Sequence, residues 1–382
     1  MTAAQQLERG LTLGVEEEYL LVDPDTGAAA SNPPRGFFKA CKDKLGKRVT
    51  PEFLRCQIEI ASDICHTAAD VRAQLHELRG VLADTAAQFD LALMAASTHP
   101  FAPWEQQKAT RGARYAQLSK DMAGAIHRMM ICGMHVHVGL EEPAHRIEVM
   151  NQMRYFLPHM LALSASSPFW NGQRMGMHAY RLSVFDGMPR TGMPETMVSW
   201  GEYTDLIDTL VQAGVIEDSS KVWWDIRPSH KFPTLEMRVC DVCTRVEDAV
   251  AVAALYQCLT RRILRLATQN MKWRLYPAFL IEENRWLAQR RGVQGELIDF
   301  GTGEAVGYAQ LAEELTALLA EDADALSCTD ELAHIRTIVE RGTSAQRQIA
   351  TYEARIEAGD DHGAALRAVV LELIRDTVAD IR

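Results

Sequence analysis

The sequence predicts an α+β fold in which helices pack on one face of a mainly antiparallel sheet. Short segments that alternate polar and apolar residues are interspersed with longer segments of helical periodicity, which indicates strands and helices in one chain. The strands do not recur in regular βαβ units, and each keeps one polar face, as antiparallel strands commonly do. The 382 residues are 47% hydrophobic and 24% charged, which is an ordinary globular composition.

In chain order, the expected strands span residues 11–22, 54–60, 131–139, 221–228 and 234–239. The first strand ends at a turn-forming cluster that starts with Asp23 and Pro24. A helix should begin after the N-cap Thr67 and run to about Ala95. Residues 148–163 have helical spacing, and a further long helix should follow Thr244 and end near Asn270.

Residues 167–195 show no clear period and contain four glycines, four methionines and three arginines. A segment of that length is either a functional loop or a set of weakly formed elements. From residue 305 onward the chain is acidic, rich in Ala and Leu, and helical. A break near residues 301–303 therefore divides a main domain, residues 1–304, from a helical C-terminal extension, residues 305–382, which we expect to pack on that same domain.

The net charge and the distribution of apolar residues argue against nucleic acid and a membrane as partners. Lys and Arg total 40 and Asp and Glu total 51, which gives a net charge of −11 and disfavours nucleic-acid binding, because phosphates need a basic surface. The start of the chain has no signal-peptide core, and no apolar stretch is long enough to predict a membrane span. The eight cysteines have no regular spacing, so we expect reduced thiols in a cytoplasmic protein.

Alternation along each strand places chemically active side chains on one face, opposite the apolar ones. They are Glu16, Glu18, Glu59, His135, His137, Glu236 and Arg238. Carboxylates gathered in this way repel one another unless a cation neutralises them. Carboxylate oxygens suit Mg²⁺ or Mn²⁺, which commonly bridge to substrate phosphates. Arg238 adds a planar donor for a phosphate or a developing oxyanion.

Other interpretations of these residues stay open. A solvated polar face is the usual explanation for any single alternating strand, and the pair His135 and His137 would also suit Zn²⁺. Cys240 and Cys243 form a lone CxxC, which we interpret as two structural thiols, because zinc sites usually need a second pair. The sequence has neither a P-loop nor a strand-linked GxGxxG, so any ATP would be held by metals and arginines on the sheet.

The segment after residue 167 is the expected place of substrate capture. Arg174, Arg181 and Arg190 are each candidates to bind a carboxylate or a phosphate. The methionines of the segment suit an adaptable apolar lining better than a metal site. Trp223 and Trp224 should face opposite sides of a strand, so that one enters the core and the other flanks a nucleotide base.

Six segments, in the same order along the chain, resemble the type 2 glutamate–cysteine ligase family, whose members are also called carboxylate–amine ligases. They are GVEEEY at 14–19, GMHVHVG at 133–139, SPFW at 167–170, WDIRP at 224–228, TLEMRV at 234–239 and RGTSAQRQ at 341–348. The resemblance implies a fold like the catalytic domain of glutamine synthetase and the guanidino kinases, which is a curved antiparallel sheet backed by helices. The resemblance runs from about residue 11 to 350, and we expect residues 1–304 to form the catalytic carboxylate–amine ligase domain.

The resemblance also implies ATP, with two or more Mg²⁺ ions, or Mn²⁺ in their place, between the sheet and the phosphates. The positions that match the family's metal-binding glutamates are Glu16, Glu18, Glu59 and Glu236; His135 and His137 match its metal and nucleotide neighbourhood. Arg238 matches a phosphate-contacting arginine, and Arg227 is expected near it. Glu59, Arg227 and Arg238 are therefore the expected catalytic set, with Trp224 beside the nucleotide.

The implied reaction has two steps. A carboxylate, glutamate's γ-carboxylate in the best-known members, attacks the γ-phosphoryl group of ATP and gives an acyl phosphate and ADP. An amine, cysteine or another, then displaces phosphate and forms an amide. Cations are needed because two anions must approach each other. The alternatives are phosphoryl transfer to a guanidino or other small acceptor, a non-catalytic Mg-ATP-binding protein and zinc-dependent hydrolysis.

One segment departs from the pattern of the family. Many relatives carry an Asp-Thr-Gly-like stretch in the loop after SPFW, whereas this chain has Arg174-Met175-Gly176. The identities of the acid and of the amine therefore stay open. The resemblance also suggests a homodimer.

Overall fold

The computed structural model, which describes residues 1–112, 122, 126, 128–379 and 381, is organised around one antiparallel sheet. In chain order its strands are β1 (Leu13–Val22), β2 (Val49–Pro51), β3 (Gln57–Ala61), β4 (Ala92–Met94), β5 (Met134–Gly139), β10 (Ile226–Pro228) and β11 (Thr234–Met237). They lie in the order β10-β11-β5-β1-β3-β2, and β4 pairs with the end of β1. The predicted α+β class with a mainly antiparallel sheet is confirmed.

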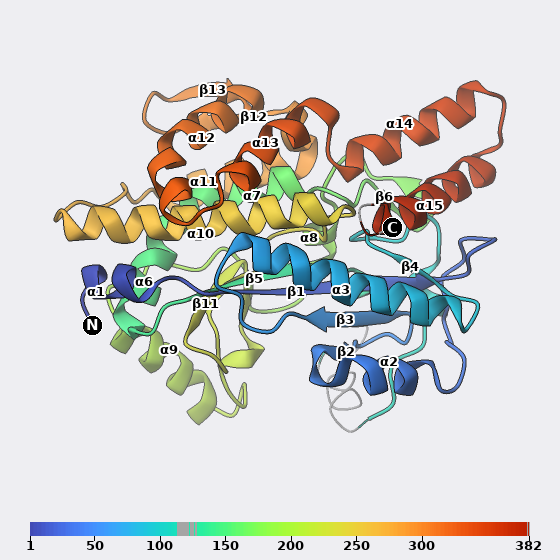
Figure 1. The fold of residues 1–382 in the computed structure, drawn as a ribbon, viewed down its shortest axis with the longest axis horizontal. Coiled ribbons are helices and arrows are strands. Elements are labelled where there is room, and N and C mark those ends of the chain that lie inside the picture. The colour runs from blue at the N-terminus through green and yellow to red at the C-terminus, as the bar shows by residue number, and fades with distance from the viewer. Residues whose placement is uncertain (113–121, 123–125, 127, 380, 382) are drawn as a thin grey trace.

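Two long helices cover one face of this sheet. α3 (Ala68–Ala87) and α10 (Val246–Thr268) contact each other and β1, and Figure 1 shows both running along the strands. A capping box between Thr67 and Asp70 starts α3. In the described part of the chain up to residue 291, the other α-helices are α1 (Ala3–Arg9), α2 (Phe37–Leu45), α6 (Pro143–Met153), α7 (Leu157–Ser164), α8 (Arg181–Phe185), α9 (Trp200–Gln212) and α11 (Ala278–Arg291).

The helix-covered face of β1 holds one charged group. Val15, Glu17 and Tyr19 alternate inward and are fully or almost fully buried. The buried guanidinium of Arg79, from α3, donates to Glu17 Oε2 at 2.9 Å and to the Tyr19 hydroxyl at 3.0 Å. A buried carboxylate is tolerated there because a cation neutralises it and its oxygens are hydrogen-bonded.

The predicted helix from Thr67 ends at Ala87, not near Ala95. Asp90 takes a left-handed conformation, with φ of 56°, which breaks the helix. The apolar residues that follow form β4, in which Leu93 and Met94 pair with β1. The helical pattern of the sequence continues past Ala87, but pairing with the distant strand β1 makes the residues after Asp90 a strand.

Two other predicted elements are interrupted. The helical spacing of residues 148–163 becomes α6 and α7 with a 3₁₀ turn at Arg154–Phe156, because Pro158 cannot donate to the helical ladder. The strand expected at 221–228 divides into β9 (Trp223–Trp224), which pairs with β8 (Thr191–Gly192), and β10, which joins the main sheet. Residues 167–195 contain short elements, namely β6 (Phe169–Trp170), β7 (Gln173–Arg174), α8 and β8.

The C-terminal segments pack against the sheet-bearing part of the chain. They are β12 (Glu296–Asp299), β13 (Glu304–Gly307), α12 (Tyr308–Ala325), α13 (Thr329–Arg341), α14 (Ser344–Glu357) and α15 (His362–Val378). α12 and α13 contact α10, and α15 contacts β4. At the start of α14, Ala345 N donates to Ala165 O at 3.0 Å, and Gln348 Nε2 donates to Ser166 O at 2.9 Å.

All eight cysteines lie in the described part of the chain and are buried, unbridged thiols, including Cys240 and Cys243. None of the helices in the described ranges combines the length and the apolar character that crossing a bilayer requires.

Candidate active site

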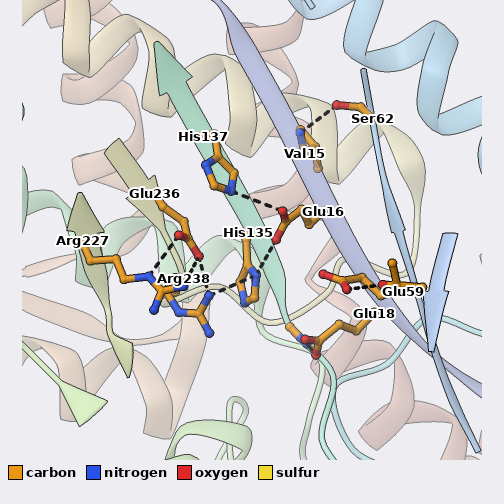
Figure 2. A network of polar contacts seen from close by, with 12 residues as sticks. Val15, Glu16, Glu18, Glu59, Ser62, His135, His137, Arg227, Glu236 and Arg238 are labelled. Carbon is orange, nitrogen blue, oxygen red and sulfur yellow. Dashed lines mark hydrogen bonds and ion pairs between the residues drawn. The ribbon is translucent and has the colours of Figure 1, made fainter. Parts of the chain in front are cut away.

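The polar face of the sheet brings together side chains from separate strands. Arg227 of β10 lies opposite Glu236 of β11, which lies opposite His137 of β5. Farther along the same face, Glu16 of β1 is the register partner of His135. We call the following residues the sheet cluster: Glu16, Glu18, Glu59, His135, His137, Arg227, Glu236 and Arg238. Figure 2 shows these side chains converging from their separate strands.

Glu16 occupies the middle of the sheet cluster, between two buried imidazoles. Its Oε2 lies 3.1 Å from His135 Nδ1, and its Oε1 lies 3.6 Å from His137 Nε2. Burial alone would raise the pKa of Glu16, but the contacts with the two histidines outweigh burial and lower that pKa well below its usual range. Glu16 is therefore held as a carboxylate, ready to act as an anionic ligand.

Glu18 and Glu59 form the acidic end of the cluster and are register partners. Glu18 Oε2 accepts a hydrogen bond from Gly133 N at 2.7 Å, and Glu59 Oε2 accepts one from Thr50 Oγ1 at 2.7 Å. Burial and the nearby charges of Glu52, Glu16 and Glu18 raise the pKa of Glu59 well above its ordinary value. A bound cation would remove this repulsion and favour the ionised carboxylate.

Glu236 forms the other end of the cluster, together with two arginines. Arg227 Nε donates to Glu236 Oε2 at 3.0 Å, and Arg238 Nη1 donates to Glu236 Oε1. Burial would raise the pKa of Glu236, but the charges of Arg238 and Arg227 lower it well below its usual range. Arg238 Nη1 also lies 3.4 Å from His135 Nδ1, so its guanidinium reaches the centre of the cluster.

The donor atoms of the cluster fit divalent cations. Three groups have ligand atoms within 4.8 Å of one another: Glu16, His137 and Glu236; Glu16, Glu59 and His135; and Glu18, Glu52 and Glu59. The Nε2 atoms of His135 and His137 are buried and have no hydrogen-bond partner among the described residues. The donor sets are mostly carboxylate and contain no thiolate, so they suit Mg²⁺ or Mn²⁺ better than Zn²⁺.

Glu52 is a member of the acidic group that the sequence analysis missed. It follows β2, an edge strand of three residues whose alternation is too short to detect from sequence. The signal that would have identified it is cross-strand pairing, because Thr50 lies opposite Glu59 and brings the chain after β2 beside that carboxylate.

The three arginines predicted for substrate capture lie in three different environments. Arg174 is exposed and pairs with Glu353 of α14 at 2.7 Å. Arg190 donates to Lys221 O at 2.8 Å, and its guanidinium lies over the Trp223 ring. Arg181 is 3% exposed, and its guanidinium lies against Gly133. The loop between β6 and β7 is further anchored by His362, whose Nε2 lies 2.8 Å from Gly172 O.

A cavity of about 330 Å³ adjoins the Glu236 end of the cluster. It is lined by Arg146, Trp200, Tyr203, Thr204, Ile207, Asp208, Ser219 and residues 229–233. The Phe232 ring in its wall lies 6.5 Å from the His137 ring, edge to face, which connects the cavity to the cluster. Trp224 does not line the cavity, but its ring lies 6.4 Å from the Tyr203 ring that does.

Known proteins share this fold and sequence. A relative from Jannaschia sp. (strain CCS1), named as a candidate glutamate–cysteine ligase 2, is 50% identical over 370 residues, which are 97% of each chain. A relative of the same name from Rhodospirillum rubrum is 50% identical over 378 residues, covering 98% of this chain and 97% of its own.

Two solved structures match at the level of fold. The glutamate–cysteine ligase of Francisella tularensis, solved in complex with AMP, matches with a TM-score of 0.65 and 13% identity over 97% of this chain and 93% of its own. The bifunctional glutathione synthetase of Pasteurella multocida matches with a TM-score of 0.68 and 14% identity, over 98% of this chain and 53% of its own.

The family model for glutamate–cysteine ligase family 2 matches residues 12–372, a range that includes every residue of the sheet cluster. This chain belongs to glutamate–cysteine ligase family 2.

Proposed function

We propose that the protein is an ATP-dependent ligase that joins the side-chain carboxylate of a glutamate-like acid to the amine of cysteine or a similar compound. The reaction has two steps: the carboxylate oxygen attacks the γ-phosphorus of ATP and releases ADP, and the amine nitrogen then attacks the acyl phosphate and releases inorganic phosphate. The amine loses a proton as the amide bond forms. Membership of the family supports the reaction class, because relatives carry the ligase name.

One observation carries the proposal more than any other. Three groups of residues that could hold a metal ion and two arginines occupy one continuous face of one sheet, and the buried His135 Nε2 there has no hydrogen-bond partner among the described residues. Unpaired buried nitrogens are costly unless a ligand takes up their hydrogen-bonding capacity. The face is therefore organised for a charged ligand that the protein must bind together with cations.

The glutamates of the cluster would hold the cations. Glu16, Glu59 and Glu236, with the neighbouring histidines, supply the ligand atoms. Bound Mg²⁺ or Mn²⁺ would neutralise phosphate charge and so lower the repulsion between the two anionic substrates.

Arg238 and Arg227 would bind the phosphates. Their shared partner Glu236 fixes both guanidinium groups in orientation, and a preoriented fork binds phosphate oxygens with less loss of side-chain entropy. Because Arg238 reaches the centre of the cluster, we assign it to the transferring phosphoryl group. Arg227, at the edge beside the cavity, is assigned to the rest of the triphosphate.

The cavity beside Glu236 would accept the nucleotide base. Its lining combines aromatic rings from Trp200, Tyr203 and Phe232 with polar groups, and aromatic faces suit a planar base. Trp224 supports this wall through Tyr203. Arg174 and Arg190 remain the candidates for contact with the carboxylic acid or the amine.

The first experiment measures ADP release with Mg²⁺, using glutamate and cysteine together, each alone, and then a panel of other acids and amines. We expect ADP release to require both an acid and an amine, and mass measurement to identify an amide. A stable phosphorylated acceptor without an amide would instead establish phosphoryl transfer. Tight Mg-ATP binding without ADP release across the whole panel would contradict a ligase.

Matched variants test the site itself. Glu16→Gln and Glu236→Gln each replace a carboxylate with a neutral group of the same shape and should abolish ADP release, with the circular dichroism spectrum retained. Glu283→Gln, an exposed position on α11, makes the same chemical change away from the sheet and should leave turnover unchanged. Turnover that survives both cluster substitutions would remove the assignment of the metal ligands.

A further inference from the structure

Arg181 lies against Gly133, a glycine next to the sheet cluster. It is the first residue of α8, and its backbone N donates to Ser167 Oγ at 3.0 Å. Its guanidinium packs on Gly133, the residue just before β5. A Cβ atom added at Gly133 would lie 2.3 Å from Arg181 Nη2, so only glycine leaves room for the guanidinium in this position.

Gly133 connects this arginine to Glu18. Gly133 N donates to Glu18 Oε2 at 2.7 Å, and Glu18 N donates to Gly133 O at 3.1 Å. The peptide groups around Gly133 therefore fix both the backbone and the carboxylate of Glu18. The Arg181 guanidinium packs against this same segment.

The same guanidinium also holds the backbone of Arg238. Arg181 Nη2 donates to Arg238 O at 3.3 Å, and Arg181 Nη1 donates to Val239 O at 3.4 Å. From the other side, Arg238 N donates to Asp225 O at 2.7 Å. The residue that follows β11 is thus held at both its N–H and its C=O, which limits the directions that its side chain can take.

We propose that Arg181 and Gly133 form a positioning pair that orients the Glu18 carboxylate toward a cation and the Arg238 guanidinium toward the transferring phosphoryl group. This proposal rests on the proposed ligase function. It assigns Arg181 a role different from substrate capture, because its side chain is almost completely buried and its Nη atoms face backbone carbonyls. Burial raises the pKa values of Asp225 and Asp241, and the nearby charge of Arg181 opposes that rise.

The pair makes a prediction about kinetics. Misplacing a catalytic group by about 1 Å can cost about 100-fold in rate, so Arg181→Lys and Arg181→Gln should lower kcat by roughly 10- to 100-fold. The KM for the acid should stay within about twofold, because no direct contact with the acid is lost. Arg181→Lys should keep more activity than Arg181→Gln, because lysine retains the positive charge. It should still fall below the wild type, because lysine lacks the planar guanidinium group.

A double-mutant cycle tests the pairing directly. Gly133→Ala should lower kcat about as much as Arg181→Ala, because the added methyl group displaces the guanidinium. In the Arg181→Ala background, the same methyl group meets no guanidinium, so Gly133→Ala should add less than about a twofold effect. Arg367→Lys, at an exposed position of α15, controls for the chemical change of arginine to lysine.

The outcomes separate this proposal from the proposed function. A wild-type protein that releases no ADP with any acid and amine would contradict the ligase function itself. If the wild type is active and the Arg181 variants raise the acid KM about tenfold with kcat unchanged, Arg181 binds substrate and the positioning role is wrong. Independent, multiplicative effects in the cycle would also overturn the pairing. Should Gly133→Ala not fold, the kcat and KM values of Arg181→Lys and Arg181→Gln still decide.

Discussion

Three consecutive glutamates on β1 have different environments because their side chains alternate across the sheet. Glu16 and Glu18 lie on the open face with the sheet cluster, whereas Glu17 faces the helices and pairs with Arg79. The same residue type therefore supplies ligand atoms on one side and a buried ion pair on the other. The buried pair anchors α3 to the strand that carries the central ligand.

Removing one partner of this pair should be costly. Arg79→Met leaves the Glu17 carboxylate buried without its cation, and such changes typically cost about 3–5 kcal/mol. Urea unfolding should show this loss as a lower midpoint. Adding Glu17→Gln to Arg79→Met should recover part of the stability, because the uncompensated charge is gone. A double variant less stable than Arg79→Met would contradict this explanation.

His99 should make stability depend on pH. Its Nε2 lies 2.9 Å from Gly27 O, and its Nδ1 accepts from Ala102 N at 3.0 Å, so the buried ring is neutral. Burial lowers the pKa of His99 to about 4. The unfolded chain, with a histidine pKa near 6.5, takes up the proton first as pH falls. The folded state therefore loses about 3 kcal/mol from this group as pH falls from about 6.5 to 4.

The measurement is the free energy of unfolding at a series of pH values. His159 and His178, whose pKa values burial also lowers to about 4, add to the same slope. His99→Asn retains an acceptor for the backbone N–H groups but cannot titrate, so the slope below pH 6.5 should fall by about one proton. An unchanged slope would show that His99 is not neutral in the folded protein.

At the scale of elements, the N-terminus of α3 is stabilised by local hydrogen bonds. Thr67 Oγ1 accepts from Asp70 N at 3.1 Å, and Asp70 Oδ2 accepts from Thr67 N at 3.0 Å. Thr67→Ala should cost about 1 kcal/mol, as measured for other N-caps. Thr209→Ala, on the exposed side of α9, is the matched control and should change the unfolding midpoint little. Equal losses in both variants would contradict the cap.

The strands that carry the cluster are well predicted from the sequence. In these strands the same two-residue alternation determines which side chains are buried and which carry polar groups. In β1, β5 and β11, alternation places ligands and core residues on opposite faces, so their grouping could be predicted without coordinates. β2 and β4 are too short for that signal and are defined by their pairing with β3 and β1. Glu52 and the true end of α3 were missed for this reason.

The environments of the loop arginines could not be predicted either. Nothing local distinguishes Arg174, which is exposed beside Glu353, from Arg181, which is buried under Gly133. These environments are set by contacts between residues that lie 48 to 179 positions apart in the chain. The sequence groups the three arginines in one segment, but only the fold decides what each one contacts.

At the scale of the whole molecule, the C-terminal helices complete hydrogen bonds of the sheet-bearing part. Thr377 Oγ1 accepts from Ala95 N at 2.9 Å, and Ser344 Oγ lies 2.6 Å from Thr244 Oγ1. Deleting residues 344–382 would remove these partners and expose the apolar surface under α15. We expect the truncated chain to lack a cooperative unfolding transition in circular dichroism. A truncated chain that folds and releases ADP would contradict this dependence.

The loop between β6 and β7 is anchored from outside the sheet, by His362 to the carbonyl of Gly172 and by Glu353 to Arg174. The face that carries the sheet cluster is instead fixed by backbone pairing among β10, β11, β5, β1 and β3. Substitutions in the loop therefore leave the strand ladder intact. Sequence changes can therefore accumulate in this loop while the sheet keeps its geometry, so the scaffold is free to diversify at its rim.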